Sequence, residues 1–442
     1  MKKSFIYLIP AIFLLAGCGK KISIKINTNE STVAESTIKE SVKDDGVKVQ
    51  HDVEMLKAHV YYKIADDGNT IPQLSVEGNE KLNDIVNKIN NDWVGGYYPR
   101  INLTRTDTSV FSALLATTVV NGSTDTKELL RGVNIDPNTG KELKIEDVLK
   151  DPVRLYDRLE KDNYLADEYG EDIEGLSDKL KTVLTNPDAF NLGANDKADL
   201  AWTLSSGGMM IHMTKKDEYG ERIVSIPLEY AIYGEFFSED ILRLPKDYAF
   251  EIPTGKEIKI NLDGKIRTVK IEQDIDEYLM LKEIDVTVDG EKSTYEEGAS
   301  YGISKASVVK KGDNAYLYIE LQYDNDYNSI SIIDLNNKSE KMEIQESFAD
   351  TSLLNPDEFY LGNRIYTIST LGIEGRYTLD NKGMPKLLEN YYNITTPIRL
   401  TTKIDIKGKK LDSINGKELG DYDIPTGTSL VPMGTDKETF TD

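Results

Sequence analysis

Three histidines, His51, His59 and His212, are the side chains best suited to proton transfer or metal binding. His59 and His212 fall in segments with the alternation of strands, and His51 stands at the edge of a polar N-terminal stretch. Isolated histidines in strands are more often structural or exposed than metal ligands, and no His-Glu-x-x-His motif is present. We therefore predict no metal site, no cofactor and no histidine-based catalytic centre.

Two further short patterns have the residue types of a site but not its full spacing. Ser36-Thr37-Ile38-Lys39 matches Ser-x-x-Lys, but it lies in a polar stretch with no core to desolvate the lysine. The segment 324–328 has the acidic spacing of a calcium loop, yet Ser329 stands where the glycine belongs and Leu335 where the glutamate belongs. We interpret the first as chance and the second as a solvated hairpin tip.

The segment 95–100 is the strongest candidate for contact with a partner. It offers Tyr97, Tyr98 and Arg100 after a helix, and binding hot spots favour tyrosine and arginine. The alternative is a loop whose tyrosines cover the core. The hypothesis that two carboxylates catalyse glycan hydrolysis also stays open, because the sequence does not give the distance between any two acidic side chains. We find no catalytic motif and predict that the protein is not an enzyme.

The N-terminus has the order of an export signal. Lys2 and Lys3 precede a short apolar run, and small residues follow it before Cys18, the only cysteine. The apolar run is too short to span a bilayer, which needs roughly 20 residues. Leu15-Ala16-Gly17-Cys18 resembles a bacterial lipobox. The resemblance implies removal of 1–17 as a signal peptide and acyl chains, palmitate among them, on Cys18, which would hold the protein on the extracytoplasmic face of the cell membrane.

The charge balance is strongly acidic. The chain has 53 basic and 76 acidic residues, for a net charge of −23. Such a surface does not neutralise phosphates, so we predict that no nucleic acid binds. It favours cationic partners and steers them at low salt. The alternative is that the charge serves solubility alone.

The chain divides into five predicted parts. After the signal peptide, 18–50 lacks a sustained apolar period and is expected to be a disordered tether. Strands and helices mix over 51–245, an α+β pattern in which Asn79 caps a helix over 79–93, Asp151 caps a second helix and Ser177 a third. From 246 to 395 the pattern is β-rich, with Asp-Gly turns at 263–264 and 289–290. No fixed period repeats there, so we predict a mixed β domain and not a propeller. Residues 396–442 look like the start of a small SH3-like barrel, and either its last strand is missing from the given sequence or the barrel is incomplete.

The order of motifs in 51–245 resembles the paired extracellular domains of PdaC-type peptidoglycan deacetylases and of the lysozyme-sensing anti-sigma factor RsiV. The motifs are Ile71-Pro72-Gln73-Leu74, Thr106-Asp107-Thr108-Ser109, the run 133–143, Trp202-Thr203-Leu204 and Val224-Ser225-Ile226-Pro227. The chain departs from the family at 121–124, where the family often has Gly-Gly-Ala-His, and at 215–220, where it often has a segment rich in tyrosine and proline. The resemblance therefore does not carry the family's binding properties over to those two loops.

The resemblance implies a binding or sensing role without the deacetylase domain and with a lipid anchor in place of a membrane span. The function predicted from the sequence is therefore a membrane-anchored extracytoplasmic lipoprotein of the cell envelope that binds a cationic protein such as lysozyme, or peptidoglycan. Two alternatives remain: a structural envelope component without a ligand, and an enzyme acting on wall glycans.

Overall fold

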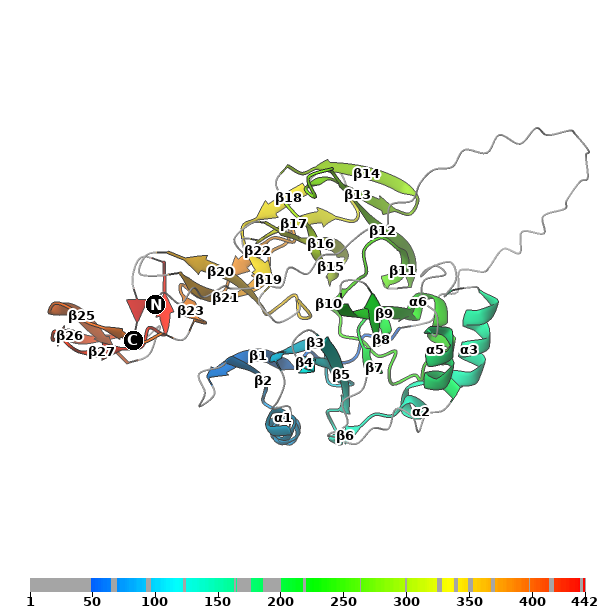
Figure 1. Ribbon diagram of the computed structural model, residues 1–442, viewed down its shortest axis with the longest axis horizontal. Coiled ribbons are helices and arrows are strands. Elements are labelled where there is room, and N and C mark those ends of the chain that lie inside the picture. Colours follow the sequence, from blue (N-terminus) through cyan, green and yellow to red (C-terminus); the bar gives the residue numbers. More distant parts are fainter. Residues whose placement is uncertain are drawn as a thin grey trace, which may run out of the picture. The chain divides into compact units, whose positions relative to one another are not determined.

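The computed structural model is mostly β, and its sheets are small and antiparallel (Figure 1). Its described part is 49–441 except for 65–69, 93–96, 122–124, 163, 165–175, 186–199, 218–219, 263, 299, 324–327, 338–340, 349–352, 367–369, 397, 413–416 and 438–439. In this part every helix lies between residues 80 and 236, and only strands follow. The predicted order, a region of mixed helices and strands followed by a β-rich region, is therefore confirmed.

The first elements are a hairpin and the helix that covers one of its faces. They are β1 (Lys57–Ile64), β2 (Thr70–Glu77) and α1 (Glu80–Asp92). The α1 residues Leu82, Val86 and Ile89 are buried against Val60 and Leu74 of the hairpin. The side chain of Asn79 accepts a hydrogen bond from the Leu82 amide at 3.0 Å, which confirms the predicted N-cap.

A polar anchor also fixes α1 to β2. The side chain of Asn90 accepts from the Leu74 amide and donates to the Leu74 carbonyl, both at 2.8 Å. An amide side chain supplies a donor and an acceptor at once, so it completes the hydrogen bonding of one backbone residue on β2. The other face of the hairpin is left available for contacts with residues from later in the chain.

A second sheet runs in the order β3-β4-β5-β6. Its strands are β3 (Tyr97–Thr106), β4 (Phe111–Asn121), β5 (Asp125–Asp136) and β6 (Lys141–Glu142). A turn follows β5, in which the Asp136 carboxylate accepts a hydrogen bond from the Asn138 amide and Gly140 has φ 71°.

Helices and a three-stranded sheet share the next core. The elements are α2 (Ile145–Val148), α3 (Pro152–Lys161), α5 (Leu176–Thr185), β7 (Leu200–Leu204), β8 (Gly208–Asp217), β9 (Gly220–Glu229), α6 (Tyr230–Tyr233) and the 3-10 turn η2 (Gly234–Phe236). Asp151 caps α3 as predicted, by accepting from the Arg154 amide at 3.0 Å. The predicted Ser177 cap is wrong, because α5 already includes that residue, and its hydroxyl lies 3.3 Å from the Tyr156 hydroxyl.

Strands β5 and β7 approach each other closely at Gly132. A Cβ atom at this position would lie 2.0 Å from the Trp202 carbonyl oxygen, so only glycine fits. The side-chain amide of Asn134 donates to the same carbonyl at 3.0 Å. The contact joins the sheet of β3 to β6 with the sheet of β7 to β9.

The β-rich region forms successive antiparallel meanders, an arrangement like the blades of a propeller. One sheet has the order β11-β12-β13-β14 and the next has the order β10-β15-β16-β17-β18. The strands are β10 (Tyr248–Glu251), β11 (Glu257–Leu262), β12 (Lys265–Ile275), β13 (Leu281–Val288), β14 (Glu291–Glu296), β15 (Gly302–Lys311), β16 (Asn314–Gln322), β17 (Asn328–Asp334) and β18 (Lys341–Ile344). The prediction against a propeller-like arrangement was wrong, because meanders whose strands run from 4 to 11 residues produce no fixed sequence period.

The C-terminal segment contributes strands to the last sheets. One sheet has the order β19-β20-β21-β23-β28-β29, with β22 also paired to β21. The strands are β19 (Ser347–Phe348), β20 (Phe359–Ile365), β21 (Leu371–Leu379), β22 (Pro385–Leu387), β23 (Tyr392–Ile394), β24 (Leu400–Thr401), β25 (Ile406–Leu411), β26 (Glu418–Ile424), β27 (Ser429–Leu430), β28 (Gly434–Thr435) and β29 (Phe440–Thr441).

The predicted SH3-like barrel over 396–442 is not what this segment forms. Strands β24 and β27 pair only with each other, β25 and β26 likewise, and β28 and β29 belong to the sheet of β21. The physical reason is that most side chains of β25 and β26 are exposed on both faces, whereas a small barrel needs side chains that fill its interior. The predicted domain division at 245/246 stays a prediction.

Candidate functional site

A cleft lies between the β1–β2 hairpin and the start of β20. Alternation along β1 turns Ala58 and Val60 toward the core beside α1, so that Lys57, His59 and Tyr61 occupy the opposite face. Pairing with β2 places Glu77 directly across from Lys57. The hairpin therefore presents a polar and aromatic face to whatever packs against it.

The second wall comes from residues almost three hundred positions later in the chain. Leu354 is buried in the same core cluster as Val60, and its carbonyl accepts from the Ala249 amide at 2.8 Å. Phe359 is buried in a neighbouring core cluster, which leaves Glu358 and Tyr360 on the side of the cleft. The resulting space is about 500 Å³, including the part open to solvent.

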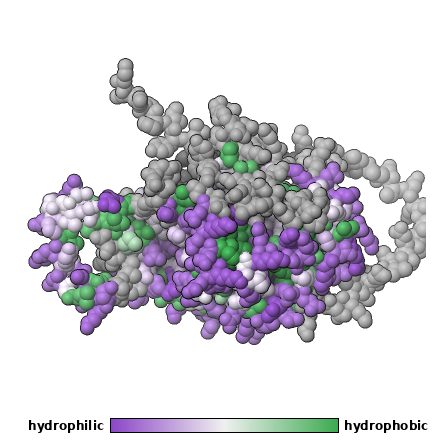
Figure 2. All heavy atoms as spheres, turned by 90° about the horizontal axis from the view of Figure 1, so that it is seen from below, coloured by the Kyte–Doolittle hydropathy of each residue, from purple (hydrophilic) through white to green (hydrophobic). Residues whose placement is uncertain are grey.

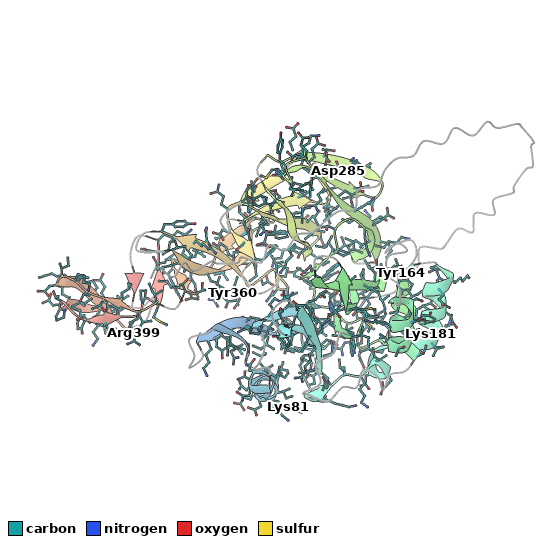
Figure 3. All side chains as sticks on the ribbon, viewed as in Figure 1. Lys81, Tyr164, Lys181, Asp285, Tyr360 and Arg399 are labelled. Carbon is teal, nitrogen blue, oxygen red and sulfur yellow. The ribbon has the colours of Figure 1, made fainter. Side chains whose placement is uncertain are left out.

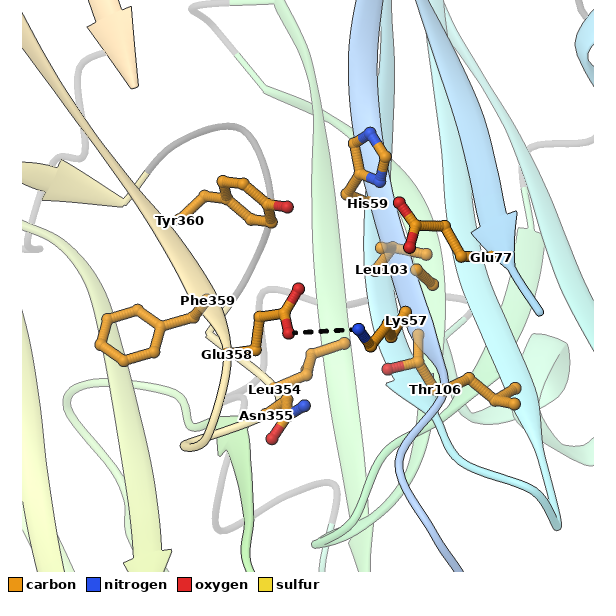
Figure 4. A pocket seen from close by; sticks show the side chains of 12 residues that line it. Lys57, His59, Glu77, Leu103, Thr106, Leu354, Asn355, Glu358, Phe359 and Tyr360 are labelled. Atoms are coloured by element: carbon orange, nitrogen blue, oxygen red, sulfur yellow. Dashed lines mark ion pairs between the residues drawn. The ribbon is translucent and has the colours of Figure 1, made fainter. Parts of the chain in front are cut away.

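Aromatic rings meet across this cleft. Figure 4 shows Tyr360 and His59 on opposite walls, with the Glu77 carboxylate next to the His59 ring. The ring centroids of His59 and Tyr360 are 5.8 Å apart and those of His59 and Tyr61 are 6.0 Å apart. Figure 3 marks the place of Tyr360 on the chain. Aromatic faces with nearby carboxylates are the surroundings in which organic cations are bound.

Glu358 is the most connected carboxylate of the site. One of its oxygens faces the Lys57 ammonium at 3.8 Å (Figure 4). The other accepts a hydrogen bond from the Arg376 guanidinium at 3.3 Å. Arg376 also donates to Glu389 at 2.6 Å. The Lys57 side chain is long and exposed, and its 3.8 Å distance from Glu358 is close to the longest that an ion pair allows. An exposed ion pair of this kind contributes little free energy, so a ligand cation can displace Lys57 easily.

Burial sets the protonation of the two rings. It lowers the pKa of His59, against the opposing effect of the carboxylates of Glu77 and Glu358. Burial likewise raises the pKa of Tyr360 to about 12, with a further contribution from Glu358. At neutral pH His59 is therefore uncharged and Tyr360 is a neutral phenol, which leaves the carboxylates free of a competing histidine cation.

The site differs from the one expected from the sequence. Tyr97, Tyr98 and Arg100 do not lie in a loop after the helix but in strand β3, where the Tyr97 backbone pairs with Thr118 of β4. Arg100 donates to the Glu128 carboxylate at 2.6 Å across the same sheet. Arg100 is not among the described residues that line the cleft. The role of the three residues in partner binding stays a prediction.

The three histidines are not brought together. His51 lies 2.9 Å from the Pro245 carbonyl oxygen and stacks on Tyr248. His212 is buried in β8 between two hydroxyl groups, and His59 lies in the cleft. No group of three or more His, Cys, Asp or Glu side chains in the described ranges could hold a metal ion.

Several predicted features lie outside the described residues. They are the signal peptide, Cys18, nearly all of the tether, the Ser-x-x-Lys match and 324–327 of the calcium-like segment. Among the helices that the structure does describe, none has the length and apolar character needed to cross a membrane.

Sequence reasoning missed the cleft because its walls are far apart along the chain. The signal available was the polar outer face of β1, with His59 and Lys57 beside Glu77. Nothing in the sequence indicates that Glu358 and Tyr360 pack against that face, because the contact depends on how the sheets are arranged. Comparison of the chain with protein-family models and with curated proteins finds no match.

Proposed function

We propose that the protein is a binding or sensing module of the cell envelope, anchored to the membrane through lipid on Cys18, that recognises a cationic protein such as lysozyme. The observation that carries this proposal is the cleft, in which two carboxylates and two aromatic rings converge. Such a site suits the ammonium of lysine or the guanidinium of arginine on a protein surface.

The net charge supports the same ligand class. A chain with a net charge of −23 attracts a basic protein before contact, and the cleft then supplies specific partners for individual cations. Figure 2 shows that the described surface on the side viewed is mostly hydrophilic. The resemblance of 51–245 to lysozyme-sensing domains points to lysozyme as the probe, and to peptidoglycan as the second ligand to test.

An enzyme acting on glycans is less well supported by the cleft. A general acid needs a carboxyl group in apolar surroundings that hold it protonated. Glu358 instead faces two cations, Lys57 and Arg376, and this arrangement favours electrostatic binding over proton transfer.

The experiment uses the 44–442 fragment, which forms one compact unit and contains every described buried residue of the core. We expect saturable binding of this fragment to lysozyme, measured by calorimetry, that weakens as salt rises because the charges are screened. Sedimentation with insoluble peptidoglycan is measured in parallel. Binding to peptidoglycan alone would replace lysozyme with wall material as the ligand. If neither ligand binds, the proposal fails and the structural alternative takes its place.

A further inference from the structure

The β25–β26 hairpin is largely exposed on both faces. Among the described strands, each pairs only with the other. A two-stranded hairpin without a packed face is marginally stable in water. The hairpin and its neighbours also hold a concentration of exposed apolar side chains, namely Ile404, Ile406, Leu419 and Tyr422.

The register divides the hairpin into two different faces. Directly paired residues share a face, so Ile406 and Ile424 lie with Tyr422 on one side. The other side carries charge pairs: Lys409 with Asp421 at 2.7 Å, and Lys407 with Asp423 at 3.9 Å. One face thus carries Ile406, Tyr422 and Ile424, with Lys410 toward the turn, and the other carries lysines on β25 opposite acids on β26.

The two strands also carry net charges of opposite sign. Strand β25 has three lysines and no acid, whereas β26 has three acids and no base. The free edge beside β25 is therefore basic and the free edge beside β26 is acidic. An edge strand presents unpaired backbone groups that can pair with a strand of another chain.

We propose that this hairpin joins copies of the protein, with the free edge of β26 in one copy pairing antiparallel to the free edge of β25 in the next. The pairing repeats the lysine–aspartate contacts that the hairpin already makes internally. Joining like strands would place lysine against lysine or acid against acid, which is destabilising. The charge pattern therefore selects head-to-tail association, which builds rings or open chains. The joined sheets also form a wider apolar face from Ile406, Tyr422 and Ile424.

Sedimentation velocity of the 44–442 fragment at increasing concentration tests this proposal. The wild type is expected to associate beyond a dimer at low salt and to dissociate at high salt. Reversing charge on one strand alone, with Lys407→Glu and Lys409→Glu or with Asp421→Lys and Asp423→Lys, is expected to abolish association. A wild type that stays monomeric throughout, or a single-strand variant that still associates, overturns the proposal.

Mixing the two variants separates edge pairing from damage to the hairpin. One variant then has two acidic strands and the other two basic strands, so each should bind the other although neither binds itself. Equimolar mixing is expected to restore association to the wild-type level. If the mixture stays monomeric while circular dichroism shows both variants folded, edge pairing is not the mode of association.

Discussion

Replacing Asp107 by alanine is expected to lower the free energy of unfolding by about 3–5 kcal/mol, because it leaves a buried arginine without its counter-ion. Arg105 and Asp107 are each 1% exposed, and the Arg105 Nε atom donates to the Asp107 carboxylate at 2.7 Å. Arg105 also donates to the carbonyl oxygens of Ile241, at 2.8 Å, and Arg243, at 2.5 Å. The second carboxylate oxygen of Asp107 accepts from the Ser109 and Val110 amides. Removing one carboxylate therefore disturbs the junction of β3, β4 and the 241–243 segment.

The matched control is Asp162→Ala. Asp162 pairs with Arg158 at the same 2.7 Å, but both side chains are partly exposed. Because solvent screens an exposed pair, this variant is expected to lose no more than about 1 kcal/mol. Urea denaturation of the 44–442 fragment gives both values. Equal losses for the two variants would show that burial of the Arg105–Asp107 pair does not matter.

Protonation linked to His212 is expected to lower the free energy of unfolding by about 3 kcal/mol as the pH falls from 6.5 to about 4. Each unit of pKa shift corresponds to about 1.36 kcal/mol. Burial lowers the pKa of His212 to about 4, from an ordinary value of 6.5. Its two ring nitrogens lie 2.9 Å from the Thr203 hydroxyl and 2.8 Å from the Ser225 hydroxyl, which suits a neutral ring.

The sign follows from which state binds the proton. Between pH 6.5 and 4 the unfolded histidine is protonated and the folded one is not, so protons favour unfolding. The contribution is fully present above pH 6.5 and is lost toward pH 4. His212→Gln should have a smaller decrease in urea midpoint over this window, whatever its stability at neutral pH. Parallel pH profiles for the variant and the wild type would contradict the burial of a neutral histidine.

Local signals predicted much of the N-terminal half. Asn79 and Asp151 cap their helices as expected because an N-cap depends on a few neighbouring residues. Ser177 failed because α5 begins one residue earlier and the hydroxyl contacts Tyr156 of another helix. The expected SH3-like barrel failed because short strands with turns between them do not specify which strands pair. Strand β28 pairs with β23, and β29 pairs with β28. No local sequence pattern indicates these pairings.

The candidate site was less predictable than the fold. The composition of Tyr97, Tyr98 and Arg100 favours a binding loop, but these residues form the start of strand β3. Composition alone does not distinguish the two. The cleft instead depends on His59 and Tyr360, whose contact is set by the packing of two sheets.

Binding of lysozyme to a cleft variant tests the central claim most directly. Glu77→Gln with Glu358→Gln removes the two cleft carboxylates, and Glu291→Gln with Glu296→Gln makes the same change of net charge on the exposed strand β14. Hydrogen bonds to charged groups contribute about 1.5–3 kcal/mol each, so the cleft variant should lose at least about tenfold in affinity. The β14 variant should stay close to the wild type. If both variants lose affinity equally, binding depends on overall charge and the cleft is not the site of recognition.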